Sequence, residues 1–249
     1  MATRTPDTLN LEERHRFLLR KLHSLSGIVP IGVFLFEHLL TNSMAFQGAD
    51  KFNDAVHGIH DLPYLFALEF FGIFLPLAFH ALYGIKIAMT AEPNVRAYPY
   101  MDNRRYFFQR LTGYIAFLFL IVHLLKFRFA HWIGWGPEFI GSDDPFEITR
   151  RGLTEWEPWG IAVPAFVTMT FYVIGLWAAC YHFANGIWSF CISWGITVGE
   201  KAQKRVGMAA AAIGILFFVW GGLSLWAFAK APKAVDSQEQ NKTMIAEPT

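Results

Sequence analysis

The sequence predicts an all-α integral membrane protein, and two observations carry this prediction. Five long apolar runs cover residues 27–46, 62–89, 107–127, 161–194 and 206–229. Each run reaches the length of about 20 residues that a helix needs to cross the hydrocarbon core of a membrane. Only 16% of the residues are charged, whereas about a quarter are charged in a typical soluble domain. Because backbone groups in lipid must be hydrogen-bonded within the protein, we expect a bundle of five transmembrane helices.

The distribution of lysine and arginine predicts how these helices are oriented. Of the 21 Lys and Arg residues, 13 lie in the N-terminal segment and in the loops on its side of the membrane, and eight lie on the opposite side. The positive-inside rule therefore places the N-terminus in the cytoplasm and the C-terminus outside. We expect one membrane domain over residues 1–249, with a cytoplasmic segment 1–22, a polar tail 231–249 and no cleaved signal peptide.

Each of the first four apolar runs contains one histidine, and the fifth contains none. These residues are His38, His80, His123 and His182. An ionisable side chain inside a membrane is a functional candidate by default. One such histidine alone would more often be a hydrogen-bonded core residue, but one on each of four successive helices favours a shared role as metal ligands.

The depths of the four histidines predict two pairs. With a rise of about 1.5 Å per residue, His38 and His123 come late in spans that run outward, so both lie toward the outer face. His80 and His182 come late in spans that run inward, so both lie toward the cytoplasm. A structural zinc site needs four ligands at one point. Two separated histidine pairs instead fit two six-coordinate b haems, with His80 and His182 as ligands of the cytoplasm-side iron and His38 and His123 as ligands of the outer iron.

The residues around the histidines agree with bulky cofactors between the helices. Small residues near His182 and His80 leave room beside the ligands, although small residues also mark ordinary helix packing in membranes; they are Ala178, Ala179, Gly186 and Gly84. Pro76 is expected to kink the second span. Haem propionates need cations or polar donors near the membrane interfaces. The alternative explanation for lysine and arginine at these positions is that they set the topology of the helices. The candidates are Lys126 and Arg128 on the outer side and Arg20, Lys21, Ser24 and Arg110 on the inner side.

Motifs that the sequence lacks narrow the function further. A net charge of +1 offers no basic surface for nucleic acid. Cys180 and Cys191 lack the spacing of a disulfide framework or an iron–sulfur site, so both are expected to be small core residues. Dinucleotide, P-loop, HExxH and hydrolase motifs are also missing from the sequence. The pattern favours a chain that carries electrons in a redox complex and leaves the substrate chemistry to other chains.

Four stretches closely resemble a known family. They are "RKLHSLSGIVPIGVFLFEHL", "FFGIFLPLAFHALYG", "FQRLTGYIAFLFLIVHLL" and "YHFANGIWSFCISWGIT". They resemble the single-chain, five-helix, di-haem cytochrome b membrane anchor of bacterial succinate dehydrogenases and fumarate reductases, and the likeness covers about residues 15–230. The resemblance implies two b haems on the four histidines in the pairing given above. It also implies a location in the bacterial inner membrane, an FAD-containing flavoprotein and an iron–sulfur subunit docked on the cytoplasmic face, and menaquinone or another quinone as the membrane substrate.

The sequence matches the family pattern approximately at one further place and departs from it at two others. The family's fumarate reductases carry an acidic quinone-site residue in the loop after the first span, where this sequence reads "VHGIHDLP". His60 and Asp61 fall at about that place and are therefore candidates for the proton-exchanging groups, followed by His57 and Glu37. The alternative is a solvated loop in which Asp61 is a helix cap. Cys180 stands where some relatives have a membrane glutamate. This replacement of the glutamate favours succinate oxidation over fumarate reduction. The loop 128–158 is longer than the family leads us to expect, and the sequence assigns it no role.

Two other functions remain open from the sequence. The first is a different membrane di-haem b cytochrome, which would belong to another quinone-linked dehydrogenase. The b subunit of quinol–cytochrome c complexes does not fit, because it places two haem ligands on one helix and no span here contains two such histidines. A haem-free, proton-coupled transporter is the second. Transporters of that kind show repeated halves and broken helices, and the sequence has no internal repeat.

Overall fold

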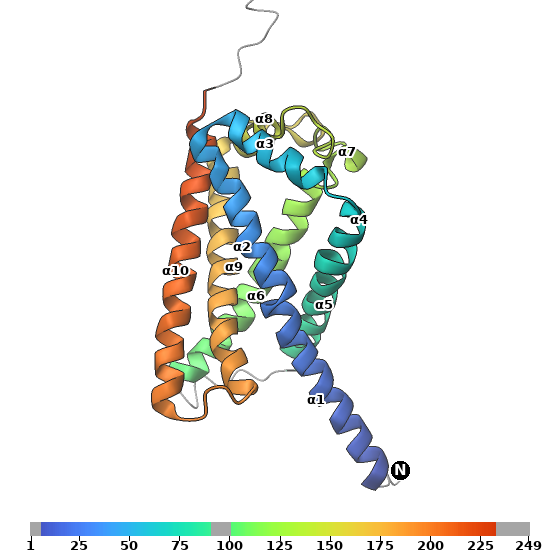
Figure 1. Cartoon of the computed structure of the whole chain (residues 1–249), viewed down its shortest axis with the longest axis vertical. Helices are drawn as coiled ribbons and strands as arrows, with labels where there is room; N and C mark the ends of the chain where they lie inside the picture. The colour runs from blue at the N-terminus through green and yellow to red at the C-terminus, as the bar shows by residue number, and fades with distance from the viewer. Residues whose placement is uncertain (1–5, 91–100, 233–249) are drawn as a thin grey trace, which may run out of the picture.

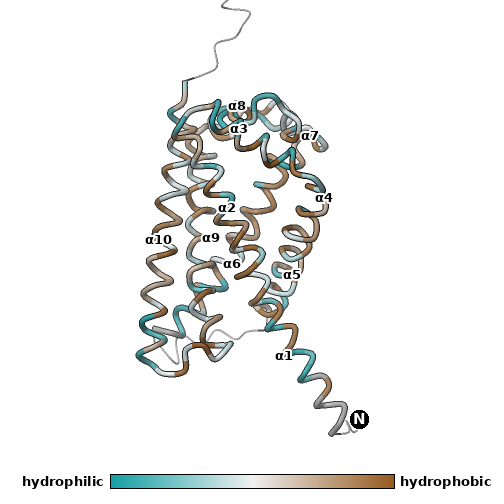
Figure 2. The backbone as a smooth tube through the Cα atoms, in the orientation of Figure 1, coloured by the Kyte–Doolittle hydropathy of each residue, from teal (hydrophilic) through white to brown (hydrophobic). Residues whose placement is uncertain are grey.

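The computed structural model describes residues 6–90 and 101–232, and every element in these ranges is a helix. Five of the helical segments are long and apolar enough to cross a membrane; they are Glu13–Gln47, Leu65–Met89, Asn103–Phe127, Ala165–Ser193 and Glu200–Lys230. They stand side by side as a bundle (Figure 1). Hydrophobic residues follow the lengths of the helices, and hydrophilic residues gather toward the ends (Figure 2). The predicted fold class, an all-α bundle with five spans, is confirmed. Most of the expected polar tail, residues 233–249, lies outside the described residues.

The first span is interrupted by a proline. α1 (Pro6–Ile28) and α2 (Pro30–Ser43) follow one another directly, and a 3-10 turn, η1 (Met44–Gln47), ends the span. Pro30 has no N–H group to bind a carbonyl one turn earlier, so one hydrogen bond is missing between the two helices, while Val29 keeps a helical backbone conformation. The helix begins well before the apolar run at residue 27, so α1 projects beyond the bundle (Figure 1).

The second and third spans flank the ten residues that the structure does not describe. The second consists of α4 (Leu65–Ala67), a π-helix η2 (Leu68–Phe74) and α5 (Leu75–Met89). The irregularity expected at Pro76 therefore takes the form of a π-helix directly before the proline. π-Helical turns inside α-helices are rare and often occur at functional sites. The third span is α6 (Met101–Phe127).

The fourth and fifth spans pack closely through small residues. α9 (Ala165–Ser193) packs against both α6 and α10 (Glu200–Lys230). A Cβ atom at Gly214 of α10 would lie 2.7 Å from the Cβ atom of Ala184 on α9, so this glycine allows the close approach of the two helices. Cys180 is a buried free thiol in this contact, as expected of a core residue, whereas Cys191 is only partly buried. α9 begins at Ala165 and not at residue 161, because Pro164 adopts an extended backbone conformation.

Short helices cover one end of the bundle, where the sequence analysis expects loops. They are α3 (Ala49–His60), α7 (Ala130–Ile133), α8 (Pro145–Thr154) and a 3-10 turn, η3 (Pro158–Gly160). We call this the capped end and the opposite end, with the turn 194–199 between α9 and α10, the uncapped end (Figure 1). The rings of Phe52, Phe146 and Phe228 meet beneath the cap at centroid distances of 5.1 to 5.9 Å. The loop 128–158 therefore helps to close the bundle.

A buried arginine holds α8 together. The Arg150 side chain is 4% exposed and bonds Glu147 at 2.7 Å and Glu155 at 2.9 Å. The hydrogen bonds to these carboxylates raise the pKa of Arg150 above its ordinary value, with Glu147 contributing most. Asn53 joins α3 to α8, because its amide donates to Asp144 at 3.0 Å and accepts from the Phe146 N–H at 2.8 Å.

Candidate functional site

The four membrane histidines lie in two pairs at two levels of the bundle. The rings of His80 on α5 and His182 on α9 have centroids 6.0 Å apart and planes at 90°. The rings of His38 on α2 and His123 on α6 have centroids 5.7 Å apart and planes at 84°. Two imidazoles that bind one metal ion from opposite sides, each through a bond of about 2 Å, have ring centres roughly 6 Å apart. Within the described residues no set of three or more His, Cys, Asp or Glu side chains could hold a metal, so each site offers two imidazoles.

Backbone carbonyls orient both histidines of the pair nearer the uncapped end. Nδ1 of His80 lies 2.9 Å from the His23 carbonyl, and Nδ1 of His182 lies 3.0 Å from the Gln109 carbonyl. A nitrogen that faces a carbonyl carries the proton, which leaves Nε2 of each ring as the acceptor that can bind a metal. This arrangement of Nδ1 on a carbonyl is typical of metal-binding histidines.

Two glycines make room for these rings. A Cβ atom at Gly27 would lie 2.4 Å from Cε1 of His80, and one at Gly113 would lie 3.0 Å from Cε1 of His182. The ring of His23 stacks on His80 with centroids 4.1 Å apart. Gly84, expected beside His80, faces the ring of His23, because a Cβ atom added at Gly84 would lie 3.0 Å from Cε1 of His23. A side chain at position 27 would therefore collide with the His80 ring, and one at position 113 would crowd the His182 ring.

We expect Gly27→Ala to disturb the His80–His182 pair. Real Cβ atoms do not approach other atoms as closely as 2.4 Å, so the His80 ring must move and lose its bond to the His23 carbonyl. The measurement is the optical and electron paramagnetic resonance spectrum of the purified protein, in which the signal of a metal centre held by this pair should shift or disappear. Gly222→Ala is the matched control in α10, because a Cβ atom there meets nothing within 4 Å. An unchanged spectrum in Gly27→Ala would contradict the role of this glycine.

The pair nearer the capped end is held by side chains. The Asn42 amide lies 3.4 Å from Nε2 of His38, and the Tyr172 hydroxyl lies 3.5 Å from Nδ1 of His123. Phe119 stacks on His123 with centroids 5.6 Å apart. Gly175 admits this phenylalanine, because a Cβ atom there would lie 2.1 Å from the Phe119 ring. Aromatic side chains therefore flank His123, and both histidines of the pair are partly buried.

Lys126 is a buried cation close to the pair at the capped end. Its residue is 4% exposed, and its Nζ atom has no hydrogen-bond partner in the described part of the chain. The ammonium lies 4.1 Å from the ring centre of Trp156 and 5.0 Å from that of Tyr172. A buried charge is costly unless an opposite charge accompanies it. A haem propionate beside His123 would supply that charge, so the residues present fit the cofactor.

The other residues expected to face propionates have different surroundings. Arg128 forms an ion pair with Glu69 at 2.9 Å. At the uncapped end, the Ser24 hydroxyl donates to the Lys21 carbonyl and accepts from the Trp194 indole at 3.0 Å, while Lys21 donates to the Ser193 carbonyl. These two residues fasten α1 to the end of α9. Arg20 is exposed and Arg110 is half-buried, and neither forms an ion pair with another described residue.

The candidates for proton exchange lie on a helix and not in a loop. His60 is the last residue of α3, and Asp61 is its exposed C-cap. His57 bonds the Ser142 carbonyl at 3.0 Å, and Glu37 accepts a hydrogen bond of 2.6 Å from Thr41 on its own helix. Burial lowers the pKa of His60 below its ordinary value, and the Glu69 carboxylate opposes this shift.

Several polar contacts of the site do not follow from the sequence pattern. The Gln109 amide donates to the His182 carbonyl at 3.1 Å, and Asn185 donates to the Gln109 side chain at 2.8 Å. The stacking of the His23 ring on His80 and the ion pair of the Glu69 carboxylate with Arg128 are further contacts of this kind. All of these groups are polar residues inside apolar helices, which is the signal that could have identified them.

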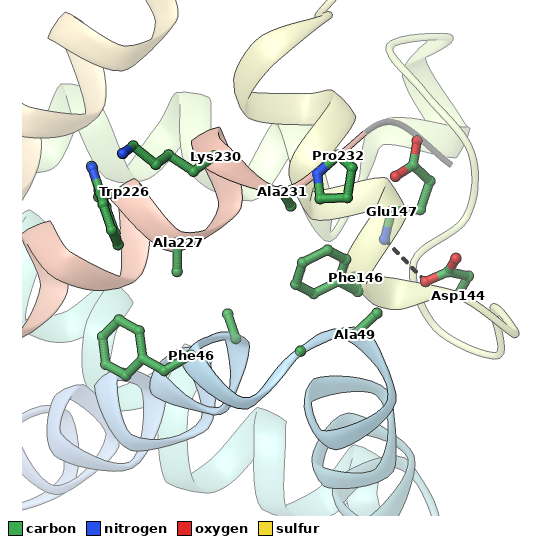
Figure 3. Close-up of a pocket in the computed structure, with 12 residues that line it drawn as sticks. Phe46, Ala49, Asp144, Phe146, Glu147, Trp226, Ala227, Lys230, Ala231 and Pro232 are labelled. Atoms are coloured by element: carbon green, nitrogen blue, oxygen red, sulfur yellow. Dashed lines mark hydrogen bonds between the residues drawn. The ribbon is translucent and has the colours of Figure 1, made fainter. Parts of the chain in front are cut away.

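A separate cleft opens at the capped end, away from the histidine pairs. Its volume is about 670 Å³, and none of the four membrane histidines lines it. Figure 3 shows Trp226 and Lys230 of α10 on one side of the cleft and Phe46 on the other, with Phe146 pointing into it.

The comparison with known proteins identifies the family. No family model matches the chain. The chain is 40% identical over 188 residues to the succinate dehydrogenase cytochrome b558 subunit of Bacillus subtilis (strain 168), and the match covers 76% of this chain and 85% of the relative. This identity and coverage agree with five helices that can cross a membrane. The chain therefore belongs to the cytochrome b subunits of succinate dehydrogenase and is a multi-pass membrane anchor of that enzyme complex.

Proposed function

We propose that this anchor binds two b haems and conducts electrons between soluble succinate-oxidising subunits and a quinone in the membrane. The observation that carries the proposal is the occurrence of two histidine pairs at two levels, each with the ring separation expected for one metal ion. When bound between two imidazoles, haem iron supplies one-electron chemistry. His80 and His182 hold the cytoplasm-side haem, and His38 and His123 hold the outer haem.

The surroundings of the pairs support this assignment. Hydrogen bonds from Nδ1 of His80 and His182 to carbonyls keep both rings fixed, so the ligands need little rearrangement to bind iron. The unpaired ammonium of Lys126 is placed to neutralise a propionate of the outer haem. Arg128 is a weaker candidate on the outer side and Ser24 on the inner side, because both already have partners. Arg20 and Arg110 remain candidates for a propionate of the cytoplasm-side haem.

The partners follow from membership of the family. An FAD-containing flavoprotein and an iron–sulfur subunit dock on the cytoplasmic face, which is the uncapped end in the orientation that the positive-inside rule predicts. Succinate chemistry takes place on the flavoprotein and not on this chain. The capped end then faces the outside, and menaquinone or another quinone reacts there beside the outer haem. His60 and Asp61 lie at that end and can exchange protons with water.

The test uses the complex of this chain with its soluble subunits, purified from membranes. Haem b and flavin are quantified in one preparation, and succinate is added while the haem absorbance is followed. We expect two haems for each flavin, reduction of haem by succinate, and quinone-dependent turnover. One haem per flavin, or haems that succinate cannot reduce, would contradict the proposal.

A further inference from the structure

An ion pair inside the second span lies in an unusual backbone segment. Glu69 is the second residue of the π-helix η2, and its carboxylate bonds Nη2 of Arg128, at the end of α6, at 2.9 Å. The side chains of both residues are mostly shielded, with exposed fractions of 19% and 27%. An irregular helical turn that carries a shielded charge is more typical of a functional site than of a simple helix contact.

Two polar atoms near this ion pair have no partner. Nε of Arg128 and Nδ1 of His60 are buried, and neither has a hydrogen-bond partner in the described part of the chain. Buried polar groups of proteins are nearly always hydrogen-bonded. The carboxylate of Glu69 acts electrostatically on His60, as do the charged or titratable groups of His57, Arg128 and Asp61. The cluster of Glu69, Arg128 and His60 therefore has hydrogen-bonding capacity for a further polar molecule.

A row of aromatic rings connects this cluster with the pair at the capped end. The ring of His123 lies 5.4 Å from that of Phe127, which lies 6.3 Å from that of Phe139. Phe139 in turn lies 6.0 Å from the ring of His60. Two phenylalanines thus lie between a proposed ligand of the outer haem and His60, so the cluster is at the same end of the bundle as that histidine pair.

The surface beside the cluster suits a ligand that arrives from the lipid. Phe66 and Phe71, on the same span as Glu69, are 75% and 66% exposed, and Tyr64 just before this span is 85% exposed. Large aromatic residues at the membrane boundary form an apolar surface with polar tips. A ligand with a polar head and a hydrocarbon tail could lie against this surface and reach the ion pair with its head.

We propose that Glu69 and Arg128 bind the quinone headgroup and that Glu69 exchanges protons with it. The inference rests on the proposed function and names residues for it. Conversion of a quinone into a quinol takes up two electrons, from the haem side, and two protons. Arg128 donates hydrogen bonds to a quinone carbonyl oxygen, and Glu69 delivers one proton with each electron. His60 returns protons from the water at the capped end to Glu69, and the reverse reaction runs through the same groups.

The test compares Glu69→Gln with Glu138→Gln in the whole complex. Glu138 is an exposed carboxylate at the same end of the bundle, so it is a matched control. Quinone-linked turnover, turnover with a dye that takes electrons from the soluble subunits, and both haem spectra are measured. We expect quinone-linked turnover to fall at least about tenfold in Glu69→Gln, with dye-linked turnover and both haems unchanged, and no effect in Glu138→Gln.

Further measurements separate this role from a purely structural ion pair. Glu69→Asp keeps a carboxylate and should restore most of the turnover with a displaced pH profile, whereas Arg128→Lys should raise KM for quinone. If Glu69→Gln loses a haem, these two variants decide the question, and an unchanged pH profile and KM would overturn the inference. Full quinone-linked turnover in Glu69→Gln would overturn it as well. Quinone-linked turnover missing from the unmodified complex would instead contradict the proposed function itself.

Discussion

His182→Leu should remove one of the two haems and leave the other. The substitution takes away one imidazole of the His80–His182 pair and its hydrogen bond to the Gln109 carbonyl. Leucine offers no nitrogen to the iron, and His80 alone cannot hold a six-coordinate haem. Because a haem held between α5 and α9 would also join these helices, assembly with the soluble subunits should become less efficient. The measurement is haem b per anchor chain in purified membranes, which should fall by half.

His131→Leu is the control for this experiment. His131 is an exposed residue of α7, outside the spans, so its loss should leave both haems in place. Normal content of both haems in His182→Leu would show that this histidine is not a ligand.

Arg150→Met should destabilise the cap without changing the haem ligands. Breaking a buried ion pair by removing one partner costs about 3 kcal/mol, and Arg150 is the 4% exposed centre of a cluster with two carboxylates. Methionine fills the space but leaves Glu147 without the Arg150 guanidinium and removes one of the cations that Glu155 contacts. We expect a lower temperature of thermal unfolding for the complex in detergent, followed by loss of the haem nearer the capped end.

The neighbouring residue provides the control. Arg151 is 64% exposed and lies 3.9 Å from Glu155. An exposed pair of this kind contributes at most about 1 kcal/mol, so Arg151→Met should unfold at nearly the temperature of the unmodified protein. Equal losses of stability in both variants would contradict the special role of Arg150.

The sequence predicts the spans well and the cap poorly, for a physical reason. A span must be apolar over its whole length, and such runs are visible in any window of the sequence. The capping helices are short and amphipathic, and they are stabilised by packing between segments far apart in the chain. Phe52 of α3, for example, meets Phe146 of α8 and Phe228 of α10. Local signals for α8 are nevertheless present, because Asp144 caps it and Pro145 begins it.

The functional site likewise has features that the sequence predicts and features that it does not. Helical rise and direction were enough to predict which histidines share a depth, and the structure brings the members of each predicted pair together. Helical rise and direction do not predict which residues surround each pair. Gly27 faces His80 only because α1 crosses α5, and Arg128 meets Glu69 only because the end of α6 lies beside η2. Contacts of this kind depend on the arrangement of helices and not on the spacing along one of them.

The central claim is that two haems are present and that each is held by one of the two histidine pairs. A redox titration of the whole complex, followed by electron paramagnetic resonance, tests it most directly when it is repeated with four variants, His38→Leu, His80→Leu, His123→Leu and His182→Leu. The unmodified complex should show two low-spin haem signals that titrate separately. One signal should be missing from both His80→Leu and His182→Leu, and the other from both His38→Leu and His123→Leu. A single haem signal in the unmodified complex, or loss of the same signal in His80→Leu and His123→Leu, would contradict the claim.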